Sequence, residues 1–296
     1  MKSVKILIAV CLLFAWQAGP ASAGDTDAGS PVEAVVLGND ISWPQCGSDL
    51  PAPPDFAIIG VNGGRPNTAN PCLATQLAWA ANTSAAKGGT PAAVYVNTAS
   101  AGPVQSVWWP ATNTYRGSEV TNPYGMCDGR ESPACAYVHG YVMAFDDVET
   151  VRSASDAAHH MWWLDVETGN SWLSDKAANA AELEGMTAYL KSTGAEVGIY
   201  STTYQFGEIV GDVNPNSNLY ALKNWIAGAD STSSARAKCA SAPLTPRGTV
   251  TLTQFTDGSL DYNYQCPVAP PTPKPGPQPE QVRSSAYADM HDAQIS

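Results

Sequence analysis

The feature that most restricts the fold is a run of large apolar residues, 161–167 (Met-Trp-Trp-Leu-Asp-Val-Glu), that ends in two carboxylates. Its residues favour a β-strand, and neither Gly nor Pro interrupts it. Because side chains alternate along a strand, Trp163, Asp165 and Glu167 share one face, and the intervening apolar residues share the other. A strand that is apolar on both faces is typical of a parallel sheet covered by helices. The run therefore predicts an α/β fold with two acids at the carboxyl end of a central strand.

The spacing of these two acids indicates a possible catalytic pair. Residues two apart on a strand lie roughly 6.5 to 7 Å apart, so the two charges repel each other. Like charge and partial burial raise the pKa of a carboxyl, and a carboxyl that is protonated near neutral pH can act as a general acid. The same spacing also fits a strand end with two solvated acids. Asp165 and Glu167 are therefore candidates that other parts of the chain must support.

The first 23 residues have the composition of a secretory signal peptide. Lys2 and Lys5 precede an apolar run at residues 6–16, and residues 21–23 (Ala-Ser-Ala) form a small-residue cleavage site. No later run approaches the roughly 20 apolar residues of a transmembrane helix. We therefore expect a protein that is secreted or cell-wall associated and has no contact with the membrane after signal cleavage.

Six of the seven cysteines lie outside this signal peptide. An even number of cysteines in an exported chain predicts disulfides, and closeness along the chain favours three local pairs. The expected pairs are Cys46 with Cys72, Cys127 with Cys135, and Cys239 with Cys266. No Cys-x-x-Cys spacing occurs, so we expect no metal site and no cofactor.

The chain is strongly acidic, with a formal net charge of −12. Removal of the signal peptide takes away two lysines and no acid, which brings the charge to −14. A protein that binds a polyanion needs a basic surface, so nucleic acid is not an expected partner. A glycan, which is neutral or of mixed charge, fits this composition.

Composition divides the chain into four segments. They are the signal peptide at 1–23, a flexible polar flank at 24–33, one folded domain at 34–266, and a Pro-rich tail at 267–296. The tail carries seven prolines within residues 267–279 and is expected to be disordered. The domain is long enough for one large core or one α/β barrel.

Strand and helix patterns alternate through most of the domain. The expected strands are 35–40, 56–61, 92–97, 161–167 and 197–201, and the expected helices are 73–86, 138–151 and 175–192. Residues 100–135 interrupt the alternation and are expected to form a long insertion held by a local disulfide. After residue 201 the pattern turns to strands with little helix between them, at 225–227, 249–255 and 260–263.

Four acids fall at the expected carboxyl ends of strands. Asp40 ends the first strand, Asp165 and Glu167 end the central strand, and Asp261 lies on the last strand. The first and last strands of a closed barrel are neighbours, so Asp40 and Asp261 would flank one side of a cleft and the central pair the other. Such a layout suits the cleavage of a glycosidic bond.

Five motifs, in this order and spacing, resemble those of the glycoside hydrolase family 25 lysozymes, the Chalaropsis-type muramidases, or of a closely related secreted domain. Residues 38–45 resemble the family's Gly-x-Asp-x-Ser-x-x-Gln, 164–167 its Asp-x-Glu strand, 198–201 its Gly-x-Tyr-Ser, 225–227 its Trp-x-Ala, and 254–263 its Gln-Tyr-Thr and Asp-x-Asn. The resemblance covers nearly the whole folded domain. It implies a modified TIM-like barrel of five β/α units followed by three strands, in agreement with the alternation of elements.

The resemblance also implies an activity. The expected reaction is hydrolysis of the β-1,4 bond between N-acetylmuramic acid and N-acetylglucosamine in peptidoglycan glycan strands, by a monomer and with retention through the substrate's own N-acetyl group. Glu167 would be protonated and would donate its proton to the leaving oxygen, and a charged Asp165 would orient the N-acetyl group. The other residues expected to contact substrate are Asp40, Tyr95, Tyr200, Gln254 and Asp261.

Three positions depart from the family pattern. Residues 60–64 (Gly-Val-Asn-Gly-Gly) stand where the family has a Lys and an acid, Val96 where it has a His, and Thr253 where it has a Trp. The acids remain, but their surroundings differ. A second hypothesis is therefore a non-catalytic cell-wall glycan-binding or wall-associated protein on the same barrel.

Two further groups of residues allow alternative interpretations. Trp108, Trp109 and Tyr124 fit either a stacking platform for sugar rings or the packing of the long insertion. Adjacent His159 and His160 point in different directions at a helix end, so a solvated or capping role is expected rather than a metal site.

Overall fold

The computed structural model of the 296-residue chain describes residues 34–267. The signal peptide, the polar flank and all but the first residue of the Pro-rich tail lie outside the described residues. Within the described range, no helix is long and apolar enough to cross a membrane.

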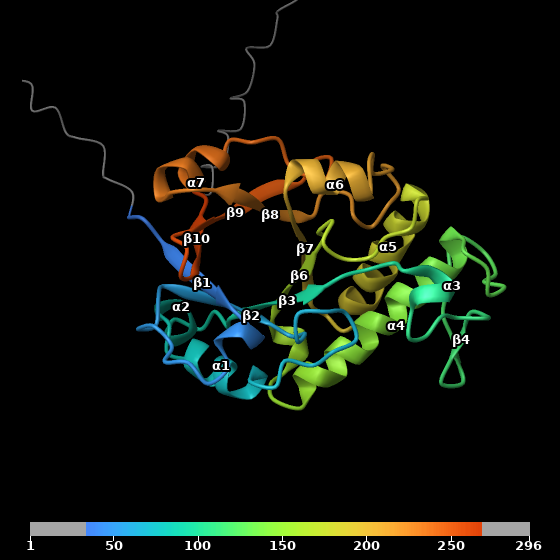
Figure 1. The fold of residues 1–296 in the computed structure, drawn as a ribbon, viewed down its shortest axis with the longest axis horizontal. Coiled ribbons are helices and arrows are strands. Elements are labelled where there is room, and N and C mark those ends of the chain that lie inside the picture. Colours follow the sequence, from blue (N-terminus) through green and yellow to red (C-terminus); the bar gives the residue numbers. More distant parts are fainter. Residues whose placement is uncertain (1–33, 268–296) are drawn as a thin grey trace, which may run out of the picture. The chain divides into compact units, whose positions relative to one another are not determined.

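Eight strands close into a barrel (Figure 1). In chain order they are β1 (Leu37–Ile41), β2 (Phe56–Gly60), β3 (Ala93–Asn97), β6 (Met161–Asp165), β7 (Glu196–Ser201), β8 (Lys223–Ala229), β9 (Thr249–Thr256) and β10 (Asp261–Gln265). Neighbours from β1 to β9 run parallel, whereas β10 runs antiparallel to both β9 and β1. The predicted α/β barrel is confirmed.

Helices cover the outside of the barrel. They are α1 (Leu73–Ala80), α2 (Ser84–Lys87), α3 (Gly102–Gln105), α4 (Pro133–Arg152), α5 (Lys176–Ser192), α6 (Thr203–Ile209) and α7 (Thr232–Lys238), with short 3-10 helices at Trp43–Gln45 and Ala157–His159. Five successive barrel strands, β2, β3, β6, β7 and β8, are each followed by an α-helix. The three strands without one, β9, β10 and β1, lie side by side in the closed sheet.

The structure differs from the expected elements in three places. The helix expected at 73–86 is two helices, because the Thr83 side chain accepts a hydrogen bond from the Ala86 backbone and caps α2. Helices α6 and α7 follow residue 201, where little helix was expected; both are seven residues long and carry few apolar residues. Strand β6 ends at Asp165, so Glu167 lies in the loop that follows it.

The two faces of β6 pack as the alternation predicts. Trp163 lies inside the barrel and packs with Ile58 and Trp225. Trp162 and Leu164 belong to the larger apolar core between the sheet and the helices. Both layers are apolar, so β6 is buried on its two faces, and only Met161 at its start is partly exposed.

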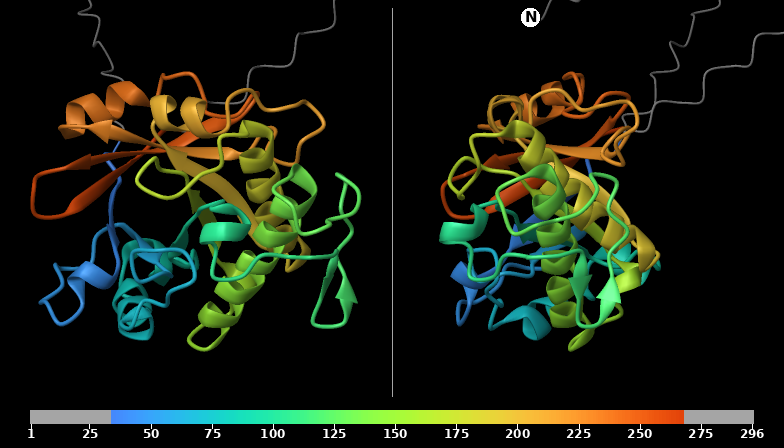
Figure 2. Two further views of the ribbon diagram at one scale, coloured as in Figure 1. Left: turned by 45° about the vertical axis from the view of Figure 1, so that its right-hand side comes forward. Right: turned by 90° about the vertical axis from the view of Figure 1, so that its right-hand side faces the viewer.

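The three predicted disulfides are confirmed, with Cα–Cα distances of 5.7 Å, 4.5 Å and 5.5 Å. Cys127 pairs with Cys135 at the start of α4 and closes the insertion onto that helix. The insertion carries α3 and a small hairpin of β4 (Thr114–Tyr115) and β5 (Ser118–Glu119), which projects beside α4 (Figure 2).

The aromatic residues of the insertion pack it against the helices. The Trp108 ring stacks on His139 of α4, with ring centroids 6.1 Å apart. The Tyr124 hydroxyl donates a 2.7 Å hydrogen bond to Glu184 of α5. Of the two interpretations of these residues, packing of the insertion is the one that the structure supports.

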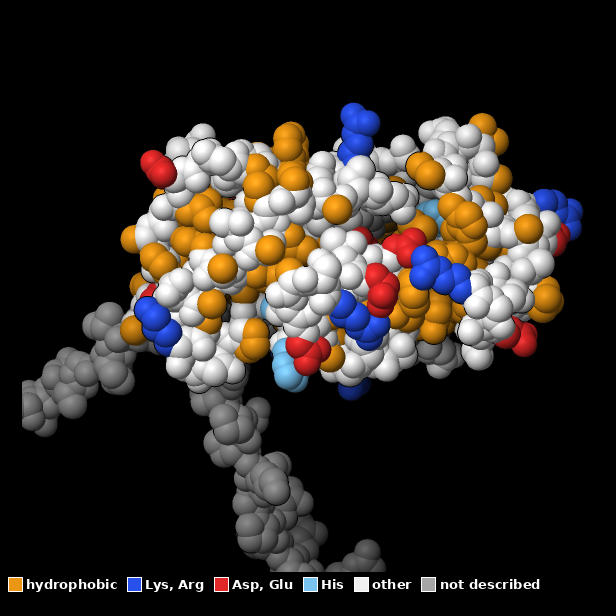
Figure 3. Space-filling model, turned by 90° about the horizontal axis from the view of Figure 1, so that it is seen from below, with side chains coloured by type: hydrophobic (Ala, Val, Ile, Leu, Met, Phe, Trp, Pro, Cys, Tyr) orange, Lys and Arg blue, Asp and Glu red, His pale blue; other side chains and the backbone are white. Residues whose placement is uncertain are grey.

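The face seen in Figure 3 carries basic and acidic side chains among many neutral and hydrophobic ones.

Candidate active site

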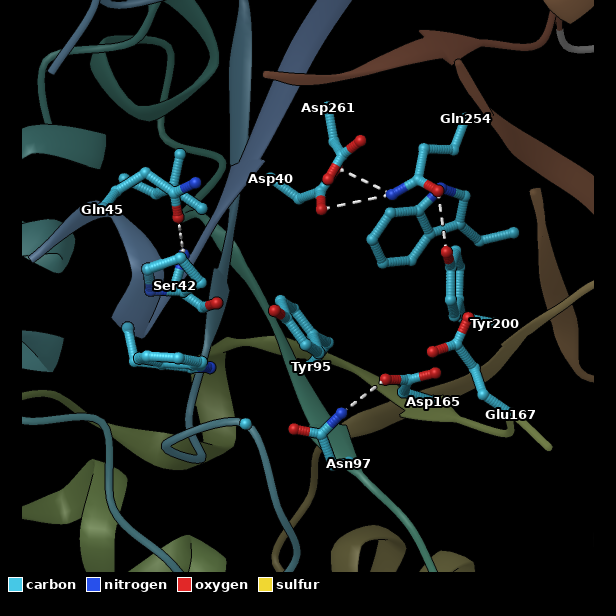
Figure 4. Close-up of a pocket in the computed structure, with 15 residues that line it drawn as sticks. Asp40, Ser42, Gln45, Tyr95, Asn97, Asp165, Glu167, Tyr200, Gln254 and Asp261 are labelled. Carbon is cyan, nitrogen blue, oxygen red and sulfur yellow. Dashed lines mark hydrogen bonds between the residues drawn. The ribbon is translucent and has the colours of Figure 1, made fainter. Parts of the chain in front are cut away.

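A cavity of about 400 Å³ opens at the edge of the barrel where the parallel strands end. All seven residues proposed from the sequence line this pocket, and Figure 4 shows their side chains around it. They are Asp40, Tyr95, Asp165, Glu167, Tyr200, Gln254 and Asp261. The strands therefore gather residues that are more than 220 positions apart in the chain.

Asp165 and Glu167 are held by the backbone around the end of β6. The hydroxyl of Ser201 donates a 2.6 Å hydrogen bond to the carbonyl of Val166, and the Trp172 indole donates a 2.8 Å bond to the carbonyl of Glu167. These bonds fix the first two residues after the strand. Asp165 is 4 % exposed, whereas Glu167 is half-buried and faces the open part of the pocket.

The two oxygens of Asp165 have different surroundings. The side-chain amide of Asn97, at the end of β3, donates a 2.7 Å hydrogen bond to Oδ2. Oδ1 is buried and has no hydrogen-bond partner among residues 34–267. A buried carboxylate oxygen without a partner disfavours the charged form.

Asp40 lies in a network of amides on the opposite side of the pocket (Figure 4). Asn263 donates a 2.7 Å hydrogen bond to its Oδ1, and Gln254 donates bonds of 3.1 and 3.2 Å to its two oxygens. The Tyr200 hydroxyl donates a 2.7 Å bond to Oε1 of Gln254. This last bond turns the Gln254 amide so that its NH₂ group faces Asp40.

Asp261 lies directly across from Asp40 in the β1–β10 ladder. The expectation that Asp261 ends its strand was wrong, because it is the first residue of β10. It still reaches the same edge of the barrel, since β10 runs antiparallel to β1. Asp261 is the most exposed of the four acids.

Burial raises the pKa of every acid in this pocket. The pKa of Asp40 rises to about 7, mainly through burial and then through the charge of Asp261, although Asn263 and Gln254 oppose the rise. Burial and the neighbouring Glu167 raise the pKa of Asp165 well above its usual range. Burial also raises the pKa of Glu167 and that of Asp261, although Asp261 is the more exposed of the two. Each of the four acids therefore holds its proton more tightly than an exposed carboxyl of the same type does.

This result changes one expectation. Asp165 was expected to stay charged beside a protonated Glu167, but Asp165 is the more deeply buried of the two. With one oxygen unpartnered, its charged form receives a hydrogen bond from Asn97 alone. The proton of this coupled pair is consequently not confined to Glu167.

Aromatic rings form the floor of the pocket. Trp225 packs against Tyr200 and Tyr95, with ring centroids 4.3 Å and 6.3 Å away. Trp43, 48 % exposed, stands at the rim. Flat apolar rings next to carboxyls suit a ligand that has both apolar faces and hydroxyl groups, as sugars do.

The sequence analysis did not assign several residues that line the pocket. The main ones are Asn97, Trp225, Ser42, Trp43 and Gln45. Asn97 was recognisable, because it is a polar residue that ends an apolar strand, as Asp165 does, and the two are register partners. Trp225 was noted only as part of a motif, since a tryptophan within an apolar run is more often part of the core.

Two of the three departures from the family pattern lie outside the pocket. Val96 is buried in the core beneath the helices, and the Thr253 hydroxyl donates to the carbonyl of Ala235 on α7. The third departure, residues 60–64, reaches the pocket through Gly64. Any change in ligand preference is therefore concentrated in the loop after β2.

The paired histidines have separate roles. His160 is buried and contacts the carbonyl of Ala92 and the hydroxyl of Ser155, at 2.6 Å and 2.8 Å. The expected solvated role is wrong for His160 but fits His159, which is exposed at the end of the second 3-10 helix. No group of three or more His, Cys, Asp or Glu side chains within residues 34–267 is placed to hold a metal ion.

Comparisons with known proteins relate the chain to lysozymes. The family model "Lysozyme-like protein 1" matches residues 135–238. "Probable GH family 25 lysozyme 4" of Dictyostelium discoideum is 37% identical over 76 residues, 25% of this chain and 34% of that protein. "Lysozyme-like protein 5" of Caenorhabditis elegans is 32% identical over 121 residues, 40% of this chain and 54% of that protein. The chain thus spans about a third and about half of the length of these curated relatives.

A solved structure extends the likeness over most of the chain. A family GH25 lysozyme from Aspergillus fumigatus has a TM-score of 0.50 and 14% sequence identity, with 80% of this chain and 96% of that chain covered. At this identity the likeness concerns the fold alone.

Proposed function

We propose that the chain, which is similar to lysozyme-like proteins of the glycoside hydrolase family 25 type, is a secreted peptidoglycan hydrolase. The proposed bond is the β-1,4 linkage between N-acetylmuramic acid and N-acetylglucosamine. The observation that carries the proposal is the meeting of Asp165 and Glu167 with Asp40 and Asp261 around one pocket. Burial raises the pKa of each of these acids, as a glycosidase requires of its acid group.

Glu167 is the proposed proton donor. It is the less buried member of the central pair, so it can approach a glycosidic oxygen in the pocket. Burial raises its pKa, so Glu167 holds its proton more tightly than an exposed glutamate does. Protonation of the leaving oxygen would weaken the bond to the anomeric carbon.

Asp165 is the proposed partner of the substrate's N-acetyl group. In substrate-assisted retention, that group attacks the anomeric carbon and becomes positively charged, and a nearby carboxylate stabilises the charge. Asp165 is protonated more readily than an exposed acid, so it would accept the amide proton or lose its own proton as the cation forms. Asp165 lines the pocket, so its carboxyl lies beside the space that the N-acetyl group would occupy.

The remaining residues would position the sugar. The amide network of Gln254, Asn263 and Tyr200 holds Asp40 opposite the central pair. Trp225 and the two tyrosines would pack against the sugar ring. The proposed active form is a monomer, because one chain supplies every residue of this arrangement.

A reducing-end assay on purified peptidoglycan tests the proposal. We expect new reducing ends at N-acetylmuramic acid, and NMR of the first product should show the same anomeric configuration as in the substrate. Binding of peptidoglycan without any release of reducing ends would favour a non-catalytic wall-binding protein. Release with inverted configuration would retain the hydrolase but exclude substrate assistance.

A further inference from the structure

A second cavity, of about 530 Å³, adjoins the candidate active site. Gly64 lines both cavities, and residues 169–171, just after Glu167, form another wall of the second one. We call this second cavity the side pocket. A substrate that fills the active site would therefore have a branch within reach of the side pocket.

The side pocket contains a buried histidine held from behind by an acid. Nδ1 of His139 lies 2.7 Å and 2.9 Å from the two oxygens of Glu182, a wholly buried residue of α5. The opposite ring nitrogen, Nε2, is buried and has no partner among the described residues. Trp108 and Trp109 pack against the ring, with centroids 6.1 Å and 5.1 Å away. The ring is thus fixed, and one of its polar atoms lacks a protein partner.

A second residue that lines the side pocket also has a buried polar atom without a hydrogen-bond partner. Oγ of Ser106, at the end of α3, is buried and has no hydrogen-bond partner within residues 34–267. Native proteins rarely leave buried polar atoms unpaired, and the exceptions are often places where water or a ligand binds. His139 and Ser106 both line the side pocket, so a small movement of either side chain would present an unpaired polar atom to a polar ligand there.

The charge of the side pocket differs from that of the active site. Its lining includes Arg65 and His139 and contains no Asp or Glu, whereas four acids line the active site. The turn that carries Arg65 is braced, because Thr68 donates a 2.6 Å bond to the Arg65 carbonyl and accepts one from the Gly63 backbone. In a chain with a net charge of −12, a pocket whose lining includes an arginine and no acid favours an anionic group.

We propose that the side pocket binds a carboxylate on the acyl or peptide branch of a muramyl sugar whose ring occupies the active site. This inference rests on the proposed function, because it takes the ligand of the main pocket to be peptidoglycan. Arg65 would pair with the carboxylate at the mouth of the pocket, and His139 and Ser106 would provide hydrogen bonds deeper inside. The loop at 60–64, which departs from the family pattern, would then form the wall between the sugar and its branch.

Imidazole signals of the uniformly ¹⁵N-histidine-labelled protein provide a test that needs no turnover. His139→Gln identifies the His139 signals by their loss, and a melting curve checks that this variant folds. Three probes are titrated: N-acetylmuramoyl dipeptide, N-acetylmuramic acid, and N-acetylglucosamine, which has no carboxylate. We expect the first to shift the Nε2 signal of His139 and the third to leave it in place. A shift with N-acetylmuramic acid would identify the lactyl carboxylate, and its absence the peptide carboxylate.

Variants of exposed arginines provide the control. Arg65→Ala should raise the Kd of the dipeptide probe about tenfold or more, since it removes a charge-assisted hydrogen bond. Arg236→Ala, on α7 and outside both pockets, should leave the Kd as in the wild type. The proposal is overturned if no carboxylate probe moves the His139 signal, which would mean that the pocket holds water only, or if Arg65→Ala binds the probe as the wild type does. Because none of the probes is cleaved, a failure here is distinct from an absence of hydrolase activity.

Discussion

The Asn97 amide reaches across from the end of β3 to Oδ2 of Asp165 at the end of β6, at 2.7 Å. The two residues are register partners in the parallel ladder, so the barrel itself sets this contact. A second side chain, Asn62, fixes Asn97 by accepting a 2.7 Å hydrogen bond from its backbone NH. Asn97 is therefore positioned to support the charged form of the acid that burial disfavours.

The first prediction concerns this amide. Asn97→Ala removes the hydrogen bond that opposes the raised pKa of Asp165, so the pKa of that acid should rise further. A hydrogen bond to a charged group contributes about 1.5 to 3 kcal/mol, so kcat should fall by roughly 10- to 100-fold. The acidic limb of the pH–rate profile should move to higher pH. Asn82→Ala, on the exposed turn before α2, is the matched control. A profile of unchanged shape in Asn97→Ala would show that the amide has only a packing role.

The second prediction concerns the central acids. Glu167→Gln keeps the size of the side chain but cannot donate a proton, so turnover should fall by a factor of roughly 100 to 10,000. Asp165→Asn should also cause a large loss, because it removes the charge that would stabilise the cationic intermediate. Both variants should melt no lower than the wild type at pH 8, since each replaces a carboxyl whose pKa is raised by burial.

Peptidoglycan hydrolysis, measured beside the wild type, checks this prediction. Asp156→Asn is the control, because Asp156 is exposed, lies outside the pocket and caps a 3-10 helix through an oxygen that Asn retains. A Glu167→Gln variant as fast as the wild type would refute the role of Glu167. If the wild type itself released no reducing ends, the wall-binding hypothesis would replace the enzyme.

Local patterns made much of this site predictable. Apolar runs that end in acids located Asp40 and Asp165, and the closure of the barrel brought Asp261 beside Asp40. The alternation of side chains assigned Trp163 to the interior of the barrel. These features depend on residues close together in the chain or on the order of the strands, and both can be read from the sequence.

Other features depend on contacts that no local pattern encodes. The hydrogen bond from Tyr200 to Gln254 joins different strands, and nothing near either residue indicates it. His139 lies on an apolar helix face, where its pairing with Glu182 of α5 follows only from the packing of α4 on α5. The degree of burial of Asp165 was equally inaccessible from the sequence, so the rise in its pKa could not be predicted.

The third prediction concerns the pH dependence of stability. Burial raises the pKa of Asp147, on α4 and outside the pocket, from 3.8 to about 7, although Asn62 donates a hydrogen bond to it. The native state therefore binds this proton more tightly than the unfolded state does. Its contribution to stability is fully present below about pH 4 and is lost as the pH rises through about 7. Asp40, whose pKa is also raised to about 7, acts in the same direction.

Denaturant unfolding between pH 5 and pH 8 measures this effect. For the wild type, the free energy of unfolding should decrease across this range. Asp147→Asn should reduce the decrease by at most about 3 kcal/mol, because part of the effect of this proton is already lost below pH 5. Asp212→Asn, at an exposed position that does not contribute to the raised pKa of Asp147, should leave the decrease as it is. Equal slopes in the wild type and Asp147→Asn would contradict the assignment.

The fourth prediction concerns the insertion. The disulfide between Cys127 and Cys135 closes a short loop, so its loss should destabilise the domain by only about 2 to 3 kcal/mol on the chain-entropy model. The double variant Cys127→Ser, Cys135→Ser should fold, but a protease should cut the insertion before the barrel. Peptide mapping after brief proteolysis locates the first cut. A first cut in the barrel would show that the insertion does not depend on this disulfide.

The last prediction compares two glycines that lie close together in the chain. Gly198 is buried in β7, where an added Cβ would lie 2.4 Å from the Trp163 ring and 2.7 Å from the end of Met161. Gly207 lies on the exposed side of α6, and an added Cβ there would meet nothing within 4 Å. Gly198→Ala must displace the Trp163 ring inside the barrel, at a cost of about 1 to 3 kcal/mol. Gly207→Ala should instead stabilise the helix by about 0.5 to 1 kcal/mol.

Thermal unfolding of both variants separates the two effects. For a domain of this size, 1 kcal/mol corresponds to a change in Tm of roughly 2 to 4 °C. The same methyl group should therefore lower the Tm at Gly198 and raise it at Gly207. Because the Trp163 ring packs on Trp225 in the floor of the pocket, Gly198→Ala should also raise the KM for peptidoglycan. A Gly198→Ala variant with the Tm and KM of the wild type would contradict this prediction, because it would show that the interior of the barrel accommodates the methyl group without displacing the Trp163 ring.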